Sequence, residues 1–97
     1  MSSVSTPYLR RNYGCEAVQV SEKNLYKVAA WCGGRVKRAR IDGVDRLYIE
    51  VPVNLRSGGT TAKRAYVGEW VILDPDGFKV YDNKEFNTIF KPWPEKF

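Results

Sequence analysis

The sequence predicts an α+β fold: a small, bent antiparallel sheet of about five strands, with one helix packed on it and a short C-terminal helix. This prediction comes from two β-hairpin signals, a helix pattern closed by paired glycines, and a capped aromatic segment before Pro92. The chain has 97 residues, of which 43% are hydrophobic, enough for one small core. We therefore expect an N-terminal arm over residues 1–12 and a single globular domain over residues 13–97.

The first helix is expected over residues 22–32, after the arm and a valine-rich strand at residues 15–20. Residues 1–12 are polar and show neither helix nor strand periodicity, which indicates an arm. Ser21 is placed to cap the helix. The apolar face of the helix repeats at the spacing i, i+3, i+4, i+7, with Leu25, Val28, Ala29 and Cys32. The pair Gly33-Gly34 should end it, because glycine adopts a positive φ without steric penalty.

A β-hairpin is expected over residues 35–53. Asp42-Gly43 separates two strand-like runs, and this dipeptide favours a two-residue type I′ turn. Such a turn fixes the register, so Val36 should face Ile49 and Lys37 should face Tyr48. The predicted core face of this hairpin consists of Val36, Leu47, Ile49 and Val51.

The second half of the chain predicts another hairpin and a short helix. The loop at residues 54–61 leads into a strand, and the turn at residues 74–77 joins strands near 70–73 and 78–81. Asp82 and Glu85 have the spacing of a helix cap for residues 82–90. Pro92 should stop this helix at or before Lys91, because the residue before proline is disfavoured in the α region.

Composition argues against most catalytic chemistry. The chain contains no histidine, which removes histidine-activated nucleophiles and histidine-ligated zinc. We expect no catalytic residues, no metal site and no cofactor. Cys15 and Cys32 are more readily explained as buried thiols than as a disulfide, although the sequence leaves the bridge open. No segment has the apolar length of a membrane span or of a signal peptide, so no membrane partner is expected.

Positive charge is concentrated in residues 35–64, which contain eight Lys and Arg residues and three Asp and Glu residues, a net charge of +5. Such a segment is a candidate for phosphate or nucleic-acid contact. Three aromatic side chains in or near it, Tyr48, Tyr66 and Trp70, would strengthen that interpretation if they were exposed as stacking platforms. Two alternatives remain open: a small anionic ligand, and solvated charges that protect a sheet edge from aggregation. The candidate contact residues are Arg35, Arg38, Arg40, Arg56, Lys63 and Arg64.

The two ends of the chain are candidates for binding a partner protein. Trp93 stands between Pro92 and Pro94, and a rigid extended segment presents an aromatic anchor at low entropic cost. Trp93 could equally pack on the protein's own core. With the arm, the candidate partner-binding residues are Tyr8, Arg10, Arg11 and Trp93.

Five segments taken in order, EAVQV, NLYKVAAWCGGRV, YIEVPV, RAYVGEWVI and FKVYDNKEFNTIF, resemble a family of small uncharacterised bacteriophage proteins. Members of that family have a helix ending in WCGG, an I-x-V-P strand, a Gly-Asp/Glu-Trp strand and a C-terminal aromatic helix. The resemblance covers residues 15–93 and implies no activity or site residues. Glu69 stands where the common form has Asp, and the loop NLRSGGTTAKR is a basic departure.

Three functional hypotheses follow. The first is a non-catalytic phage accessory protein in the host cytoplasm, which binds another protein from host or phage, or a second copy of itself. The second is a minor structural protein of the virion, ordered by neighbouring subunits. The third is nucleic-acid binding through the basic segment at residues 35–64.

Overall fold

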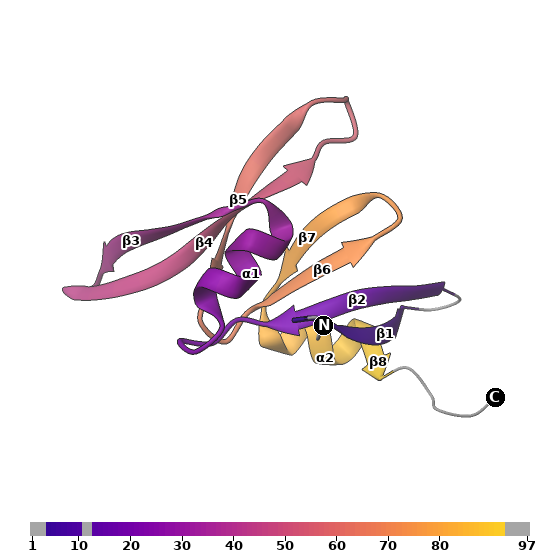
Figure 1. The fold of residues 1–97 in the computed structure, drawn as a ribbon, viewed down its shortest axis with the longest axis horizontal. Helices are drawn as coiled ribbons and strands as arrows, with labels where there is room; N and C mark the ends of the chain where they lie inside the picture. Colours follow the sequence, from indigo (N-terminus) through magenta and orange to yellow (C-terminus); the bar gives the residue numbers. More distant parts are fainter. Residues whose placement is uncertain (1–3, 11–12, 93–97) are drawn as a thin grey trace.

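The protein folds into two antiparallel sheets and two helices, in a computed structural model that describes residues 4–10 and 13–92 (Figure 1). The first sheet has five strands in the order β7-β6-β2-β1-β8, and the second has three in the order β3-β4-β5. The strands of the first sheet are β1 Thr6–Arg10, β2 Tyr13–Gln19, β6 Trp70–Asp74, β7 Gly77–Tyr81 and β8 Phe90–Pro92. Those of the second are β3 Arg35–Ile41, β4 Val44–Asn54 and β5 Thr60–Tyr66. The α+β class is confirmed, and the single five-stranded sheet is wrong.

The split into two sheets occurs after β5. The chain turns at Gly68, whose N–H donates to Val20 O at 2.8 Å, and β6 then pairs with β2 instead of β5. The run Trp70–Asp74 is almost continuously apolar because both faces of this sheet are covered. One face packs on the three-stranded sheet and the opposite face packs on α2. β6 is also an inner strand, because it pairs with β2 on one side and with β7 on the other.

Two apolar clusters hold these layers together. The larger lies between the sheets and beneath α1 (Leu25–Cys32), and its fully buried members include Val28, Ile49 and Val71. The smaller lies between the five-stranded sheet and α2 (Asn83–Ile89), around Phe86, whose ring stacks on Trp70 at a centroid distance of 3.6 Å. Successive residues of β2 and β6 point into the two clusters in turn, because side chains along a strand alternate between the faces of the sheet.

The predicted first hairpin is confirmed in turn and register. Asp42 and Gly43 have φ of 51° and 76°, as a type I′ turn requires. Val36 faces Ile49 and Lys37 faces Tyr48. The loop at residues 55–59 and the turn at residues 75–76 also join the strands that they were expected to join.

The N-terminal arm needs correction. Residues 6–10 form β1, which pairs with β2 on one side and with β8 on the other. The polar composition hid this strand, because polar residues also suit a short strand near the edge of a sheet. Residues 90–92 form β8, so Phe90 belongs to a strand and not to the predicted helix.

Both helices are shorter than predicted: α1 starts three residues later, and α2 lacks one residue of the predicted range at each end. α1 begins at Leu25 rather than at residue 22, because Ser21 and Asn24 close a turn reciprocally: Ser21 N donates to Asn24 Oδ1 at 2.8 Å and Asn24 N donates to Ser21 Oγ at 3.2 Å. α2 is capped as predicted, with Glu85 N donating to Asp82 Oδ1 at 2.7 Å. Neither helix has the length and apolar character that crossing a membrane demands.

Candidate functional site

The three-stranded sheet presents one face to the core and one away from it. Ile49, Val51 and Ala65 point into the larger cluster, so their neighbours in the strands point the opposite way. We call this second surface the outer face. It carries four cations, two tyrosines and one carboxylate: Arg35, Lys37, Arg46, Arg64, Tyr48, Tyr66 and Glu50.

Of the two tyrosines of the outer face, Tyr48 is buried and Tyr66 is half-buried. Tyr48 is only 5% exposed, and the guanidinium carbon of Arg64 lies 4.6 Å from its ring centroid. Arg64 Nη1 also donates to Tyr66 Oη at 3.1 Å, and this hydrogen bond is the main reason that the pKa of Arg64 is raised. Trp70 is stacked on Phe86, and its Nε1 donates to Asn83 Oδ1 at 2.9 Å. The exposed aromatic platforms that base stacking requires are therefore not formed by Tyr48 or Trp70.

The cations of the basic segment are mostly unneutralised. Lys37 Nζ lies 3.2 Å from Glu50 Oε2 across the outer face. Within the described part of the chain, this is the single ion pair made by the eight cations of residues 35–64. Arg35 and Arg46 share the outer face and are exposed, and neither has a carboxylate within ion-pair distance there. With four cations and one carboxylate, the outer face carries a net charge of +3.

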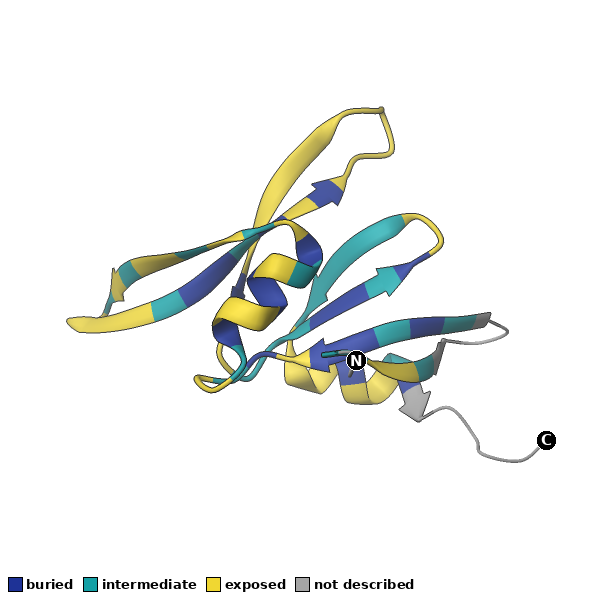
Figure 2. Ribbon diagram, in the orientation of Figure 1, coloured by how far each residue is buried: buried dark blue, intermediate teal, exposed yellow. Residues whose placement is uncertain are grey.

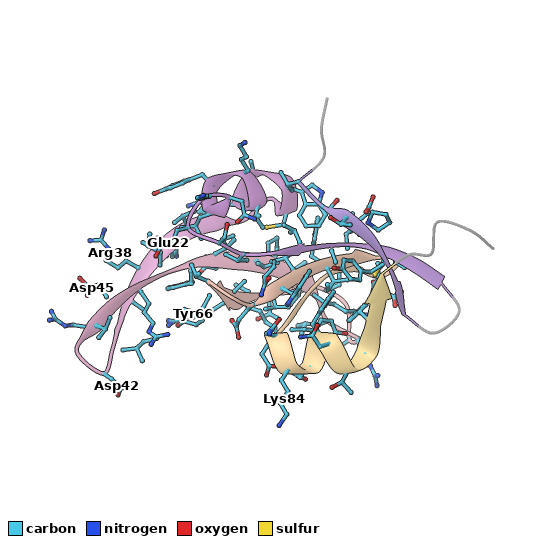
Figure 3. The ribbon with its side chains drawn as sticks, turned by 90° about the horizontal axis from the view of Figure 1, so that it is seen from below. Glu22, Arg38, Asp42, Asp45, Tyr66 and Lys84 are labelled. Carbon is cyan, nitrogen blue, oxygen red and sulfur yellow. The ribbon has the colours of Figure 1, made fainter. Side chains whose placement is uncertain are left out.

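The six predicted phosphate contacts do not share one surface. Arg35 and Arg64 lie on the outer face, whereas Arg38, Arg40 and Lys63 lie on the opposite side of the sheet by register, and Arg56 lies in the β4–β5 loop. Figure 3 shows Arg38 on the side of α1 and Tyr66 on the side of α2. Sequence reasoning missed Lys37 and Arg46 as members of the outer face. The register set by Asp42-Gly43 contained that information, because it places Lys37 beside Tyr48.

The candidate partner-binding residues are dispersed. Tyr8 packs inside the smaller cluster, with its ring 4.9 Å from that of Phe86 and 5.6 Å from that of Trp70. Arg10 is the last residue of β1, and the structure describes its backbone but not its side chain. Arg11 and Trp93 lie outside the described residues altogether. Tyr8 is thus a packing residue in this fold.

A notch lies where β5 ends alongside β4. The cavity has a volume of about 350 Å³ and is lined by Glu22, Asp45, Arg46, Leu47, Tyr66 and Val67. β5 pairs with β4 only as far as Tyr48, so residues 44–47 of β4 have β3 as their one strand partner in the described structure. Val67 is 46% exposed beside this gap. The notch therefore combines an apolar floor with charges of both signs.

Three ionisable groups away from the outer face, Cys32, Asp74 and Lys79, are buried or paired within the fold. Both cysteines are buried and unbridged, as expected, and burial raises the pKa of the Cys32 thiol. The Asp74 side chain is 1% exposed, and its Oδ2 lies 2.9 Å from Lys79 Nζ. This contact raises the pKa of Lys79. Among residues 4–10 and 13–92, no three side chains of the His, Cys, Asp or Glu types gather as metal ligands would.

Comparison with known proteins does not assign the chain to a family. It matches no protein-family model, no curated protein and no solved structure. The resemblance to a bacteriophage family stays a prediction, and any function has to be argued from the surface itself.

Proposed function

We propose that this protein is a non-catalytic nucleic-acid-binding protein, and that the cations of the three-stranded sheet contact the phosphates. The observation that supports the proposal most is the lack of internal compensation: one ion pair serves eight cations in residues 35–64 of the described chain. Like charges gathered on one sheet repel one another and weaken the folded state. A polyanion removes that repulsion and releases its own condensed counterions.

The arrangement suits the phosphate backbone better than the bases. The outer face offers guanidinium and ammonium groups on rigid strands, and Arg64 covers the ring of Tyr48. Contacts to phosphates position a protein on nucleic acid without reading its sequence. We therefore expect binding with little sequence preference and a steep dependence on salt.

The test is fluorescence anisotropy with labelled single strands of about 20 nucleotides and duplexes of about 20 base pairs across a series of salt concentrations. Engagement of four to five phosphates predicts a slope of log K against log[salt] of about −3 to −5. The variant Arg35→Gln/Arg46→Gln should bind more weakly and reduce the slope by about 2. The control Lys23→Gln/Lys84→Gln removes the same charge from exposed positions on other elements and should change binding little. A slope near zero, or equal losses in both variants, would exclude this surface.

Capture of a protein partner is the second candidate, and the notch between β4 and β5 favours it. Leu47 and Val67 give the notch an apolar floor that an inserted side chain can fill. The test is affinity capture from nuclease-treated host extract, with Val67→Asp as the matched variant. Capture that survives nuclease and is lost in Val67→Asp supports a protein partner, and capture that nuclease abolishes supports nucleic acid.

The biological setting that we propose follows the family resemblance. Either kind of binding suits a bacteriophage accessory protein that acts in the host cytoplasm. A minor structural role in the virion is the alternative. Mass spectrometry of purified phage particles separates the two, because only the second requires the protein in the particle.

A further inference from the structure

The β3–β4 hairpin continues past the third strand of its sheet as a two-stranded ribbon. β5 pairs with β4 from Asn54 back to Tyr48, and beyond that point only β3 and β4 remain paired, from Arg38 and Leu47 to the turn at Asp42-Gly43. Figure 1 shows this end of the hairpin extending away from the rest of the molecule, and Figure 2 shows its tip as exposed. We call residues 38–47 the ribbon.

The ribbon carries arginine on both faces. By register, Arg38 and Arg40 lie on the side of α1 together with Asp45, which stands opposite Arg40, and Arg46 lies on the outer face. With Asp42 in the turn, the ribbon carries three arginines against two aspartates, a net charge of +1. All three arginines are exposed, and none forms an ion pair within the described residues. Arg40 Nη2 donates to Gly43 O at 3.5 Å. An element that is cationic on both faces can contact the two walls of a groove at once.

The dimensions of the ribbon match the major groove of B-DNA. That groove is about 12 Å wide and about 8.5 Å deep, and it admits a two-stranded β-ribbon. Four residues of each strand extend beyond the third strand, which gives a reach of roughly 14 Å at about 3.4 Å per residue. The tip can therefore reach the floor of the groove while the sheet behind it stays outside.

The aromatic side chains of the sheet argue against a single strand as the ligand, because Tyr48 is buried and Tyr66 is half-buried. Proteins that bind single strands combine a cationic groove with aromatic rings on which the bases stack. Arg64 covers Tyr48, and Trp70 is already stacked on Phe86. A duplex needs no such platform, because its bases remain stacked on one another.

We infer that the ribbon enters the major groove of duplex DNA, with Arg38, Arg40 and Arg46 contacting the groove walls. This inference rests on the proposed nucleic-acid binding and adds to it the class of ligand. It predicts discrimination against duplex RNA, whose major groove is deep and narrow and closed to protein elements. It also predicts competition by a major-groove ligand and none by a minor-groove ligand.

The experiment compares duplex DNA, duplex RNA and single-stranded DNA of one sequence, at equal length and salt, with methyl green and distamycin as major- and minor-groove competitors. We expect at least about tenfold tighter binding to duplex DNA, given about 1–3 kcal/mol for each lost arginine contact. Arg38→Gln/Arg40→Gln/Arg46→Gln should remove most of this preference. Arg38→Lys/Arg40→Lys/Arg46→Lys keeps the charge and should retain phosphate binding.

The control Lys23→Gln/Lys27→Gln/Lys84→Gln removes three exposed cations from other elements and should keep the preference for duplex DNA. Circular dichroism and melting temperature establish that each variant is folded before its binding is compared. Equal affinity for the three nucleic acids, or displacement by distamycin alone, would overturn the ribbon inference and leave salt-dependent nucleic-acid binding standing. No binding to any of them would overturn both.

Discussion

Arg64 lies over the ring of Tyr48, with its guanidinium carbon 4.6 Å from the ring centroid, on the outer face of the three-stranded sheet. A cation over an aromatic face is attracted by the ring quadrupole, and here it also excludes solvent from the ring. The ring of Tyr66 lies beside that of Tyr48, at a centroid distance of 5.3 Å, and Tyr48 is 5% exposed although it lies on the face turned away from the core. Arg64 thus presents a positive charge at this position and covers an aromatic ring that could otherwise stack on a ligand.

Removing that cover should make Tyr48 reactive. In the wild type we expect tetranitromethane to nitrate Tyr26, which is 71% exposed, and to leave Tyr48 unmodified. In Arg64→Ala the ring of Tyr48 should become nitrated, as peptide mass spectrometry can show. Arg64→Lys should give an intermediate result, because an ammonium group covers a ring less completely than a planar guanidinium. Equal nitration of Tyr48 in all three proteins would contradict the contact.

The pair of Asp74 and Lys79 should stabilise the β6–β7 hairpin. Asp74 Oδ1 accepts from Asp76 N at 2.9 Å, and Oδ2 forms an ion pair with Lys79 Nζ at 2.9 Å. Lys79→Met leaves a buried carboxylate without its cation, and we expect a loss of about 1–3 kcal/mol in the free energy of unfolding. The lower end is favoured because the Lys79 side chain is 36% exposed and water can partly replace it.

Urea denaturation of Lys79→Met, Asp74→Asn and Lys84→Met measures this effect. Asp74→Asn keeps an acceptor for Asp76 N, so it should cost less than Asp74→Ala. Lys84 projects from α2 into solvent in Figure 3, and its replacement should stay within about 0.5 kcal/mol of the wild type. If Lys84→Met lowered the free energy of unfolding as much as Lys79→Met, the pair of Asp74 and Lys79 would not stabilise the hairpin specifically.

Stability should also fall at alkaline pH through Cys32. This thiol is 2% exposed, and burial raises its pKa above the ordinary value of about 8.5. A raised pKa in the folded state means that the contribution is complete below the unfolded pKa and is lost as the pH rises through the folded pKa. Cys32→Ala should be less stable than the wild type at pH 7, by about 1 kcal/mol for the small cavity.

The difference between the wild type and Cys32→Ala should narrow as the pH rises above about 9, because only the wild type must then bury or expel a thiolate. Denaturation at about pH 7, 9 and 10.5 measures it, and taking the difference between the two proteins cancels the titration of groups that they share. A constant difference over this range would show that burial does not raise the pKa of Cys32.

The features that could be predicted from the sequence are those with local chemical causes. Asp42-Gly43 determines a turn that needs positive φ at two positions, and the register of the paired residues in β3 and β4 follows from it. Asp82 caps α2 for an equally local reason. The pairing of β1 with β8 has no local cause, because the two strands are joined by contacts between opposite ends of the chain. Neither segment contains a sequence pattern that predicts which strand it pairs with.

In the candidate site, too, the features with a local cause could be predicted and those that depend on distant contacts could not. The concentration of positive charge in residues 35–64 could be read from the sequence. The predicted phosphate contacts were chosen because they lie in that segment, however, and this choice combined residues from both faces of the sheet. Arg38 and Lys37 are neighbours in sequence and lie on opposite faces. The cover over Tyr48 was not visible, because it depends on β5 lying beside β4.

Gly33 and Gly34 stand together at the end of α1, but the structure gives them different roles. Gly33 has a φ of 71°, and a Cβ added there would meet only open space, so its requirement is conformational. A Cβ on Gly34 would collide with the carbonyl oxygen of Glu50 and lie 3.0 Å from Ile49 Cγ2, so its requirement is close approach to β4. Substitutions at the two positions should therefore separate backbone conformation from packing.

Gly33→Ala should cost about 1 kcal/mol and Gly34→Ala about 2–3 kcal/mol in urea denaturation. Asparagine tolerates the left-handed conformation, so Gly33→Asn should recover part of the loss seen in Gly33→Ala. Gly34→Asn should be at least as damaging as Gly34→Ala, because the backbone of β4 cannot move aside without disturbing the pairing of β3 with β4. Recovery by asparagine at residue 34, or a greater loss at residue 33 than at residue 34, would contradict this packing of α1 against the sheet.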